Sequence, residues 1–237
     1  MTARITRSHE RGTSDLGWLQ SRFSFSFAEY RNPNRMGFGA LRVINDDRIA
    51  PSSGFDTHFH RDFEIVTVVT KGAVTHADSM GHSFTLEADE VQHMSAGSGV
   101  EHSEHNRDPE AWLELFQIWF YPAQTGITPA YQNKRFDPKL RHNRLALLVS
   151  PDEAEGSLPI AQDVRLYRGT YDHDTTLTYT PQGEGQRGIY LLVIDGRAET
   201  LGETLRKRDA IEAGDIRELS VTLTAGTDIL LFDVPFR

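Results

Sequence analysis

Two short alternating triplets contain the residues of this chain best suited to bind a metal, His58-Phe59-His60 and His102-Ser103-Glu104. Each triplet falls in a segment that is expected to form a β-strand. Because side chains i and i+2 of a strand lie on one face, His58 shares a face with His60, and His102 shares one with Glu104. If the two strands face each other across a small barrel, three imidazoles and one carboxylate converge. Such a set binds a divalent transition metal and leaves room for water, a substrate or O2.

The remaining composition narrows the chemistry further. The chain contains no cysteine, so a disulfide, a thiolate nucleophile and a cysteine-based zinc site are all excluded, and any metal must be held by nitrogen and oxygen. Glu64 lies six residues beyond His58, and simple parity places it on the same face as the ligands. Its carboxylate could be a ligand, a partner that orients an imidazole, or a rim charge, and we expect the second role. His105 has the opposite parity to His102 and should point away from the metal.

Length and composition are those of a soluble globular protein, with 237 residues, 38% hydrophobic and 25% charged. The N-terminal sequence MTARITRSHERG has no apolar segment of the kind that marks a secretory signal, and no apolar run approaches the roughly 18 residues of a membrane span. We therefore expect a cytoplasmic protein that does not enter a membrane. A formal charge of −9 offers no overall attraction for nucleic acid.

Short strand-like runs separated by Gly and Asp turns dominate the chain and favour an all-β fold with minor helix. The candidate strands are residues 40–44, 63–69, 73–77, 83–86, 114–120, 190–193 and 229–233. An aromatic run, with phenylalanines at 23, 25 and 27, has the i, i+2 spacing of a strand that packs onto a β core. We expect core packing from it rather than a cage for an aromatic substrate.

A weak internal repeat indicates two related halves. FEIVTVVTKG at 63–72 matches RGIYLLVIDG at 187–196, and both halves end in an apolar strand followed by proline. The sequence therefore predicts two tandem β-barrels, residues 1–121 and 139–237, joined by a linker at 122–138. Counting back from the repeat glycines aligns His58 and His60 with Gln182 and Glu184, and no histidine follows His173. The chemistry should therefore lie in the first half.

Three segments together resemble the pirin family of bicupins. They are GWLQSRFSFSFAEYRNPNRMGFGALRVINDD, HFHRDFEIVTVVTKG and HMSAGSGVEHSEHN, and the resemblance covers residues 4–121 closely and the second half more loosely. The first cupin motif reads Gly54, then His58-Phe59-His60, then Glu64, and the second reads Gly99 to Asn106. Phe59 stands where pirins usually have proline, and Ser52-Ser53 replaces the usual glycine-containing approach.

This resemblance implies a fold, a ligand set and two alternative functions. It implies a bicupin whose first barrel holds one divalent transition metal, Fe(II) first and Mn, Ni, Co, Cu or Zn as alternatives, through His58, His60, His102 and Glu104. In style the three segments resemble bacterial pirin-like proteins that are described as quercetin 2,3-dioxygenases. The implied activity is cleavage of a flavonol by O2, with release of carbon monoxide and a depside, and Glu104 as the base that takes the hydroxyl proton.

The competing class is a non-enzymatic, metal-dependent regulator that binds a protein partner, as some pirins are regarded to be. A third reading, a degenerate cupin that only binds a small ligand, is disfavoured by the retained ligand set.

Overall fold

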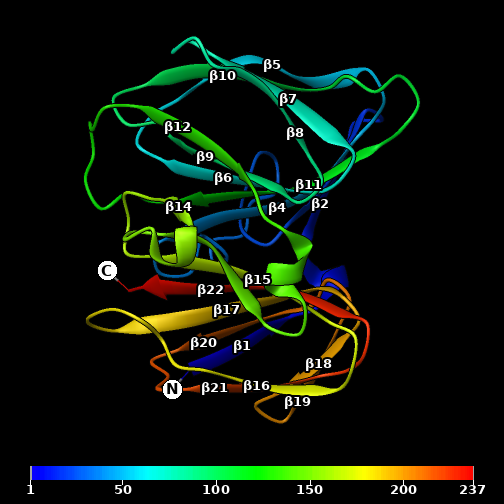
Figure 1. Ribbon diagram of the computed structural model, residues 1–237, viewed down its shortest axis with the longest axis vertical. Helices are drawn as coiled ribbons and strands as arrows, with labels where there is room; N and C mark the ends of the chain where they lie inside the picture. The colour runs from blue at the N-terminus through cyan, green and yellow to red at the C-terminus, as the bar shows by residue number, and fades with distance from the viewer. Residues whose placement is uncertain (1, 237) are drawn as a thin grey trace.

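The computed structural model describes residues 2–236, and nearly all of its regular structure is β-strand. The strands form four sheets that stack as layers, from β5 and β10 at the top of Figure 1 to β16 and β19 at the bottom. Three single-turn 3₁₀ helices occur between strands, namely η1 (Ser8–Glu10), η2 (Pro138–Arg141) and η3 (Ala154–Gly156). None of these described helices has the length or the apolar character needed to cross a membrane. The predicted all-β class with minor helix is confirmed.

The first half consists of a seven-stranded and a four-stranded sheet. In spatial order the larger sheet contains β12 (Ala130–Arg135), β9 (Glu90–Ser95), β6 (Glu64–Lys71), β11 (Leu113–Phe120), β4 (Leu41–Ile49), β3 (Leu19–Phe23) and β2 (Gly12–Asp15). The smaller sheet contains β5 (Ser53–His60), β10 (Val100–Asn106), β7 (Ala73–Asp78) and β8 (Ser83–Glu87).

The second half repeats this strand order, although the outermost pair of its larger sheet is parallel where that of the first half is antiparallel. Its larger sheet contains β1 (Thr2–Thr6), β20 (Ala210–Gly214), β17 (Arg187–Asp195), β22 (Thr227–Pro235), β15 (Arg165–Tyr171), β13 (Leu145–Ser150) and β14 (Leu158–Pro159). Its smaller sheet contains β16 (Thr175–Tyr179), β21 (Leu219–Leu223), β18 (Arg197–Thr200) and β19 (Glu203–Arg206). The repeat segments β6 and β17 occupy the third place in their sheets, so the internal repeat seen in the sequence is structural.

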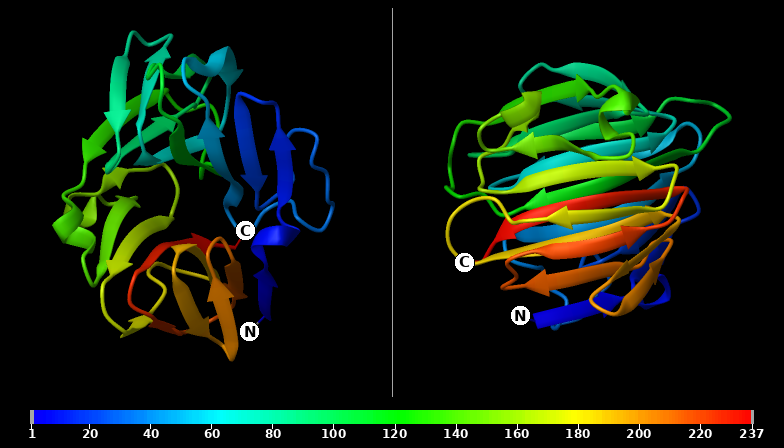
Figure 2. Two further views of the ribbon diagram at one scale, coloured as in Figure 1. Left: turned by 90° about the vertical axis from the view of Figure 1, so that its right-hand side faces the viewer. Right: turned by 60° about the horizontal axis from the view of Figure 1, so that its bottom comes forward.

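The tandem cupin-type fold that the sequence predicts is confirmed, and its sheets are not closed into barrels in the described part of the chain. In each half the two sheets form a cupin-like β-sandwich, and among residues 2–236 no strand ladder joins the edges of the larger sheet to those of the smaller one. The edge positions are instead taken by an exchange between the halves. β1, at the N-terminus, pairs with β20 in the lower half, and β12 pairs with β9 in the upper half (Figure 2).

This exchange also bears on the domain boundaries. β1 lies within the segment 1–121 yet completes the sheet of the second half, and β12 lies within the segment 122–138 that was expected to be a linker. Main-chain hydrogen bonds therefore connect the halves and cover two sheet edges that would otherwise be open. The boundaries themselves remain a prediction.

Side chains that alternate along the strands of the larger sheets pack into two different cores. One core lies between the two halves, and the other is the interior of each sandwich. On β6 the buried Val66 and Val68 face the second half, where they join a cluster that also contains Phe120, Tyr190 and Phe232. This cluster lies between the two larger sheets and joins the halves. The second sandwich contains one large apolar cluster, with the buried Arg187–Asp233 ion pair beside it, whereas the interior of the first is divided into two smaller apolar clusters. Polar side chains occupy the space between those two clusters, and the candidate site is built there.

Candidate metal centre

Strand pairing brings the two histidine-containing triplets together. β10 runs antiparallel to β5, with His102 directly opposite His58 and Val100 opposite His60. The sequence predicts that the two strands face each other across a barrel. They are instead neighbours in one sheet. Residues directly opposite each other share a face, so all three imidazoles project into the first sandwich.

A β-bulge in β5 adjusts the direction of these side chains. The register of the β5–β10 pair shifts between His102 and Glu104, so that Glu104 lies opposite Phe55 rather than opposite residue 56. The extra residue in β5 allows both Phe55 and His58 to face inward although their numbers differ in parity. Such bulges often re-aim a side chain beside a functional site.

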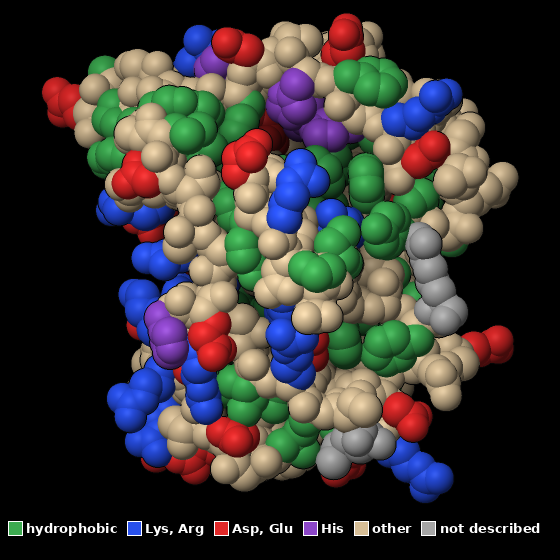
Figure 3. All heavy atoms as spheres, turned by 180° about the vertical axis from the view of Figure 1, so that it is seen from behind, with side chains coloured by type: hydrophobic (Ala, Val, Ile, Leu, Met, Phe, Trp, Pro, Cys, Tyr) green, Lys and Arg blue, Asp and Glu red, His purple; other side chains and the backbone are tan. Residues whose placement is uncertain are grey.

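The three imidazoles are close enough to share one ion. Their ring centroids are separated by 4.7 Å for His58–His60, 4.5 Å for His58–His102 and 4.8 Å for His60–His102. One nitrogen from each ring lies within 4.8 Å of the others. Histidine side chains gather at the surface of the upper half of the molecule in Figure 3, so solvent or substrate can reach this region.

The hydrogen bonds of these rings define which nitrogen atoms are free. Nδ1 of His58 lies 2.8 Å from the carbonyl oxygen of Asp56, to which it donates, so its Nε2 carries the lone pair. His102 is buried, and its Nε2 has no hydrogen-bond partner in the described structure. An unpartnered buried nitrogen beside two other imidazoles is the arrangement that a metal ion would satisfy.

Burial keeps His60 and His102 neutral, which is the form of histidine that binds metals. Burial, together with the neighbouring His58 and His60, lowers the pKa of His102 to about 2. Burial and His58 lower the pKa of His60 to about 4. Both rings therefore carry a free lone pair at neutral pH, and no proton has to leave them before a metal binds.

Glu104 lies deeper in the sandwich and belongs to a second group. Its carboxylate oxygen lies within 4.8 Å of nitrogen atoms of His76 and His102, so His102 is a member of both groups. The four predicted ligands thus lie in one region, but Glu104 is not part of the His58, His60 and His102 triad. Its carboxylate is instead held by the larger sheet.

A row of polar side chains crosses the inner face of that sheet and binds Glu104. Asn45, Gln117, Thr67 and Gln92 lie opposite one another on four adjacent strands, β4, β11, β6 and β9, and all four are buried. Nε2 of Gln92 donates to Oε1 of Glu104 at 2.9 Å, and Nε2 of Gln117 donates to Oε2. Thr67 Oγ1 adds a longer contact of 3.4 Å. Burial raises the pKa of Glu104 to about 7, although these hydrogen bonds act to lower it.

His76 and Asp78 contact the site from β7, a contribution that we did not predict. His76 lies opposite Glu104, and Asp78 lies opposite His102. Nδ1 of His76 is 3.4 Å from Nδ1 of His102, and its Nε2 is 3.0 Å from Oδ2 of Asp78. The alternation His76-Ala77-Asp78 lies at the end of the predicted strand 73–77, which in the structure extends to Asp78, and it is the same signal as in the two triplets.

Glu64 does not take the role that we expected. Its carboxylate accepts hydrogen bonds from His93 at 2.6 Å, from Ser95 at 2.6 Å and from the backbone N–H of Ala161 in the second half at 3.2 Å. Parity failed because β5 ends at His60 and β6 begins at Glu64, and the chain turns between them. Glu64 therefore shares the face of Val66, toward the second half. His105 was predicted correctly, since it lies on the other face of β10 with its Nε2 3.6 Å from Asp56.

A cavity of about 600 Å³ with several aromatic residues in its lining contains none of the three histidines, and Trp119 is the lining residue that contacts the triad. Trp119 on β11 lines it and packs edge-on against His60, with ring centroids 4.8 Å apart. Phe27, Tyr30 and Phe63 line the same cavity. Phe23 and Phe25 are buried as expected for core packing, but Phe27 contributes to this cavity as well as packing edge-on against Trp119.

The second half presents different residues at the equivalent strand positions. β21 corresponds to β10 and contributes Leu219, Val221 and Leu223, all fully buried in the apolar cluster. Gln182 and Glu184 are not the equivalents of His58 and His60, because they lie in the loop that follows β16. That loop is longer than the turn between β5 and β6, and counting back from the glycine therefore missed the strand.

Two family models match the chain. The model described as Pirin matches residues 4–120, and the model described as Quercetinase C-terminal cupin domain matches residues 147–234.

Named relatives match over almost the whole length. The chain is 41% identical to quercetin 2,3-dioxygenase of Escherichia coli K12 over 98% of both proteins. It is 40% identical to a pirin-like protein of Caulobacter vibrioides, over 94% of this chain and 95% of that protein. Among solved structures, bacterial pirin YhhW of E. coli in complex with nickel(II) superimposes with a TM-score of 0.93 at 39% identity, over 100% of both chains.

Proposed function

This chain belongs to the pirin family, and from that premise we propose that it is a metal-dependent dioxygenase that cleaves a flavonol such as quercetin with O2, releasing carbon monoxide and a depside. One observation carries the proposal. Three imidazoles converge, with a buried and unpartnered Nε2 on His102, and Trp119 joins His60 to an aromatic-lined cavity of about 600 Å³. Cavities of this size accept small organic ligands.

We assign the metal to His58, His60 and His102, with Glu104 as the fourth ligand. Nitrogen-rich sets of this kind suit Fe, Mn, Co, Ni, Cu and Zn, and Fe(II) is our first choice. The related YhhW has been solved with nickel(II), which supports a divalent transition metal in general. When bound, the metal would supply Lewis acidity toward the substrate hydroxyl and the redox chemistry that O2 requires.

Glu104 is our candidate for the general base. A pKa raised to about 7 suits a group that must accept a proton near neutral pH and release it again. In the described structure the hydrogen bonds from Gln92 and Gln117 hold the carboxylate in one position, outside the His58, His60 and His102 triad. We infer that Glu104 would leave this position to bind the metal, and that the glutamines hold it while it carries the substrate proton.

Trp119 would orient the substrate. Its ring contacts both His60 and the aromatic cavity, so a flat flavonol bound in the cavity would lie against the indole with its reacting edge toward the triad. The buried Nε1 of Trp119 has no partner among the described residues and could donate to an oxygen atom of such a substrate.

The direct test is aerobic incubation of each metal-reconstituted form with quercetin, followed by loss of flavonol absorbance and by carbon monoxide release. We expect turnover with at least one metal and none with the metal-free protein. Absence of turnover with every metal would contradict the enzymatic proposal and favour the regulator that binds a protein partner.

A further inference from the structure

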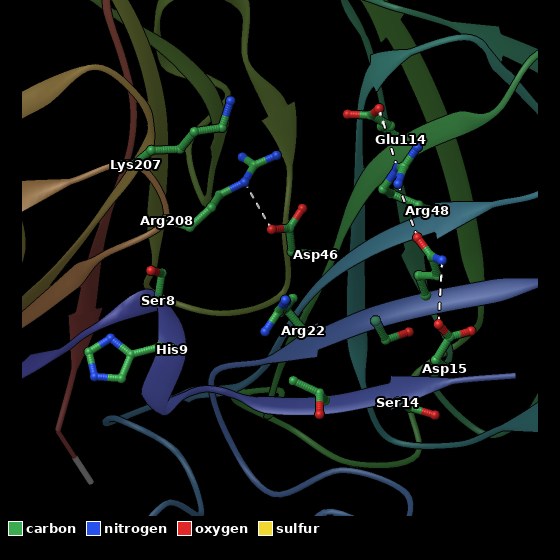
Figure 4. Close-up of a pocket in the computed structure, with 13 residues that line it drawn as sticks. Ser8, His9, Ser14, Asp15, Arg22, Asp46, Arg48, Glu114, Lys207 and Arg208 are labelled. Carbon is green, nitrogen blue, oxygen red and sulfur yellow. Dashed lines mark hydrogen bonds and ion pairs between the residues drawn. The ribbon is translucent and has the colours of Figure 1, made fainter. Parts of the chain in front are cut away.

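A second cavity, of about 740 Å³, lies at the junction of the two halves and shares none of its lining residues with the histidine triad. Its walls come from η1, from the β2–β3 hairpin and β4 of the first half, and from the turn between β19 and β20 of the second half (Figure 4). Two faces of this cavity differ in charge, and that difference defines the ligand that it suits.

Two arginines pair with one carboxylate on the first face, and a third arginine lies beside them. Asp46 Oδ2 pairs with Nε of Arg208 at 3.0 Å and with Nη1 of the buried Arg11 at 3.4 Å. Arg208 also lies over the ring of Phe116, and its Nη1 is buried without a hydrogen-bond partner in the described structure. Its backbone has a φ of 66°, in the left-handed region, which an arginine adopts only when its surroundings enforce it. One carboxylate therefore serves two guanidinium groups and leaves donors unused.

Arg22 provides the third guanidinium. It lies on β3 and projects into the cavity beside Asp46 in Figure 4. Within residues 2–236 its side chain has no hydrogen-bond or ion-pair partner, although it is exposed and free to move. Lys207 and His9 line the same side of the cavity. Because Lys207 is already paired with Asp195 at 2.8 Å, the uncompensated charge is centred on Arg22 and Arg208.

The opposite face is polar and nearly balanced in charge. Arg48 pairs with Glu114 at 3.6 Å and donates to Gln20 at 3.0 Å, and Gln20 in turn donates to Asp15 at 3.4 Å. This series of interactions, from Glu114 to Asp15, runs along the right side of Figure 4. Its carboxylates would repel a second anionic group but can accept hydrogen bonds from hydroxyls.

We propose that the junction cavity binds a phosphate monoester with a hydroxyl-bearing body, such as a sugar phosphate. The phosphate group would lie between Arg22 and Arg208, because planar guanidinium groups bind phosphate oxygens through two donors at once. The hydroxyl-bearing body would extend toward Asp15 and Glu114. A single phosphate fits this asymmetry better than a polyphosphate, since only one face is cationic.

Titration calorimetry with ribose 5-phosphate tests the proposal on the metal-loaded full chain in phosphate-free buffer. We expect one binding site per chain for ribose 5-phosphate, weaker binding of inorganic phosphate and of succinate, and no binding of ribose. Arg22→Gln should weaken ribose 5-phosphate binding at least tenfold. The matched control is Arg217→Gln, which changes an exposed arginine outside the cavity and should leave the affinity unchanged.

A second control separates this cavity from the metal, which can itself attract phosphate. The proposal requires His60→Ala to retain ribose 5-phosphate binding. Binding that is lost in His60→Ala but kept in Arg22→Gln would place the ligand at the metal and overturn the proposal. It would also be overturned by equal affinity for succinate, by equal losses in Arg22→Gln and Arg217→Gln, or by a native protein that binds none of the phosphates.

Discussion

Nδ1 of His102 lies 3.4 Å from Nδ1 of His76, and this contact leads from the triad to a buried carboxylate. Nε2 of His76 lies 3.0 Å from Oδ2 of Asp78, whose side chain is fully buried. If each neutral ring donates a hydrogen bond toward Asp78, the Nδ1–H of His102 donates to Nδ1 of His76. The Nε2–H of His76 then donates to the carboxylate of Asp78. Nε2 of His102 then carries a lone pair toward His58 and His60, as a metal ligand requires.

Asp78→Asn should therefore weaken metal binding by about 10- to 100-fold, the range typical for partners of ligating histidines. The amide can present an N–H to His76, which would no longer be held in the required tautomer. Competition with a coloured chelator measures the affinity. Asp56→Asn, at a fully exposed carboxylate, is the control and should have no effect. Equal effects of the two substitutions would show that the His76–Asp78 pair does not orient His102.

His60→Ala should lower metal affinity at least tenfold, whereas His105→Ala should be nearly silent. The first removes a coordinate bond, and the second removes a ring on the opposite face of β10. Elemental analysis of the parent protein should find close to one divalent metal per chain. Two tightly bound metals, or equal losses in the two variants, would contradict a single site at the triad.

Metal affinity should rise with pH up to about 7 and then level off. Because the pKa of Glu104 is raised to about 7, the metal-free protein holds a proton there at lower pH, and a metal that uses the carboxylate must displace it. The contribution is about tenfold in affinity per pH unit. Glu104→Gln should remove this contribution, so the two titrations, measured from pH 5 to 8, should differ in slope. Parallel curves would exclude Glu104 as a ligand.

Glu104→Gln should also reduce quercetin turnover by about 10²- to 10⁴-fold, the usual cost of losing a general base. The amide cannot accept the substrate proton even where metal remains bound. Glu64→Gln is the matched control, and we expect it to retain most activity but to lower the melting temperature. The reason is that Glu64 binds His93, Ser95 and the N–H of Ala161 at the junction of the halves. An inactive, metal-loaded Glu64 variant would transfer the base role to Glu64.

Stability should decrease from pH 4 to pH 7 because of Asp47. Burial raises the pKa of its carboxyl to about 7 in the folded protein, above the ordinary value of 3.8. The folded state therefore binds this proton more tightly than the unfolded state does. The resulting contribution to the free energy of unfolding is fully present below about pH 4 and is lost as the pH rises to about 7. Above about pH 7 the free energy of unfolding no longer changes with pH because of this group. The shift corresponds to about 4 kcal/mol at most. Asp47→Asn should be more stable than the parent protein at pH 8 in urea unfolding, and the difference should shrink toward pH 5.

The sequence by itself determined the candidate strands and which of the clustered histidines share a face, while the metal ligands themselves stay a prediction. Every candidate strand is present, because apolar alternation reports which face of a strand is buried. Parity also held within single strands, so His58 and His60 share a face and His105 points away from the triad. Side-chain direction over two residues is a local property of an extended backbone, and no knowledge of neighbouring strands is needed to read it.

Parity failed wherever the chain left a strand or where a bulge intervened. Glu64 faces the second half because a turn separates β5 from β6, and Phe55 faces inward because β5 contains a bulge. The edge exchange of β1 and β12 was equally inaccessible, since strand pairing joins residues about 200 positions apart as readily as it joins neighbours.

Only the tertiary structure decided what surrounds the triad. Gln117, Thr67 and Gln92 come from three adjacent strands, and no single strand reveals that they meet at Glu104. Arg22 and Arg208 likewise come from different halves and meet only because the two larger sheets pack together. Pairing register and sheet packing depend on the whole chain, and they set the pKa of Glu104 and the charge of the junction cavity.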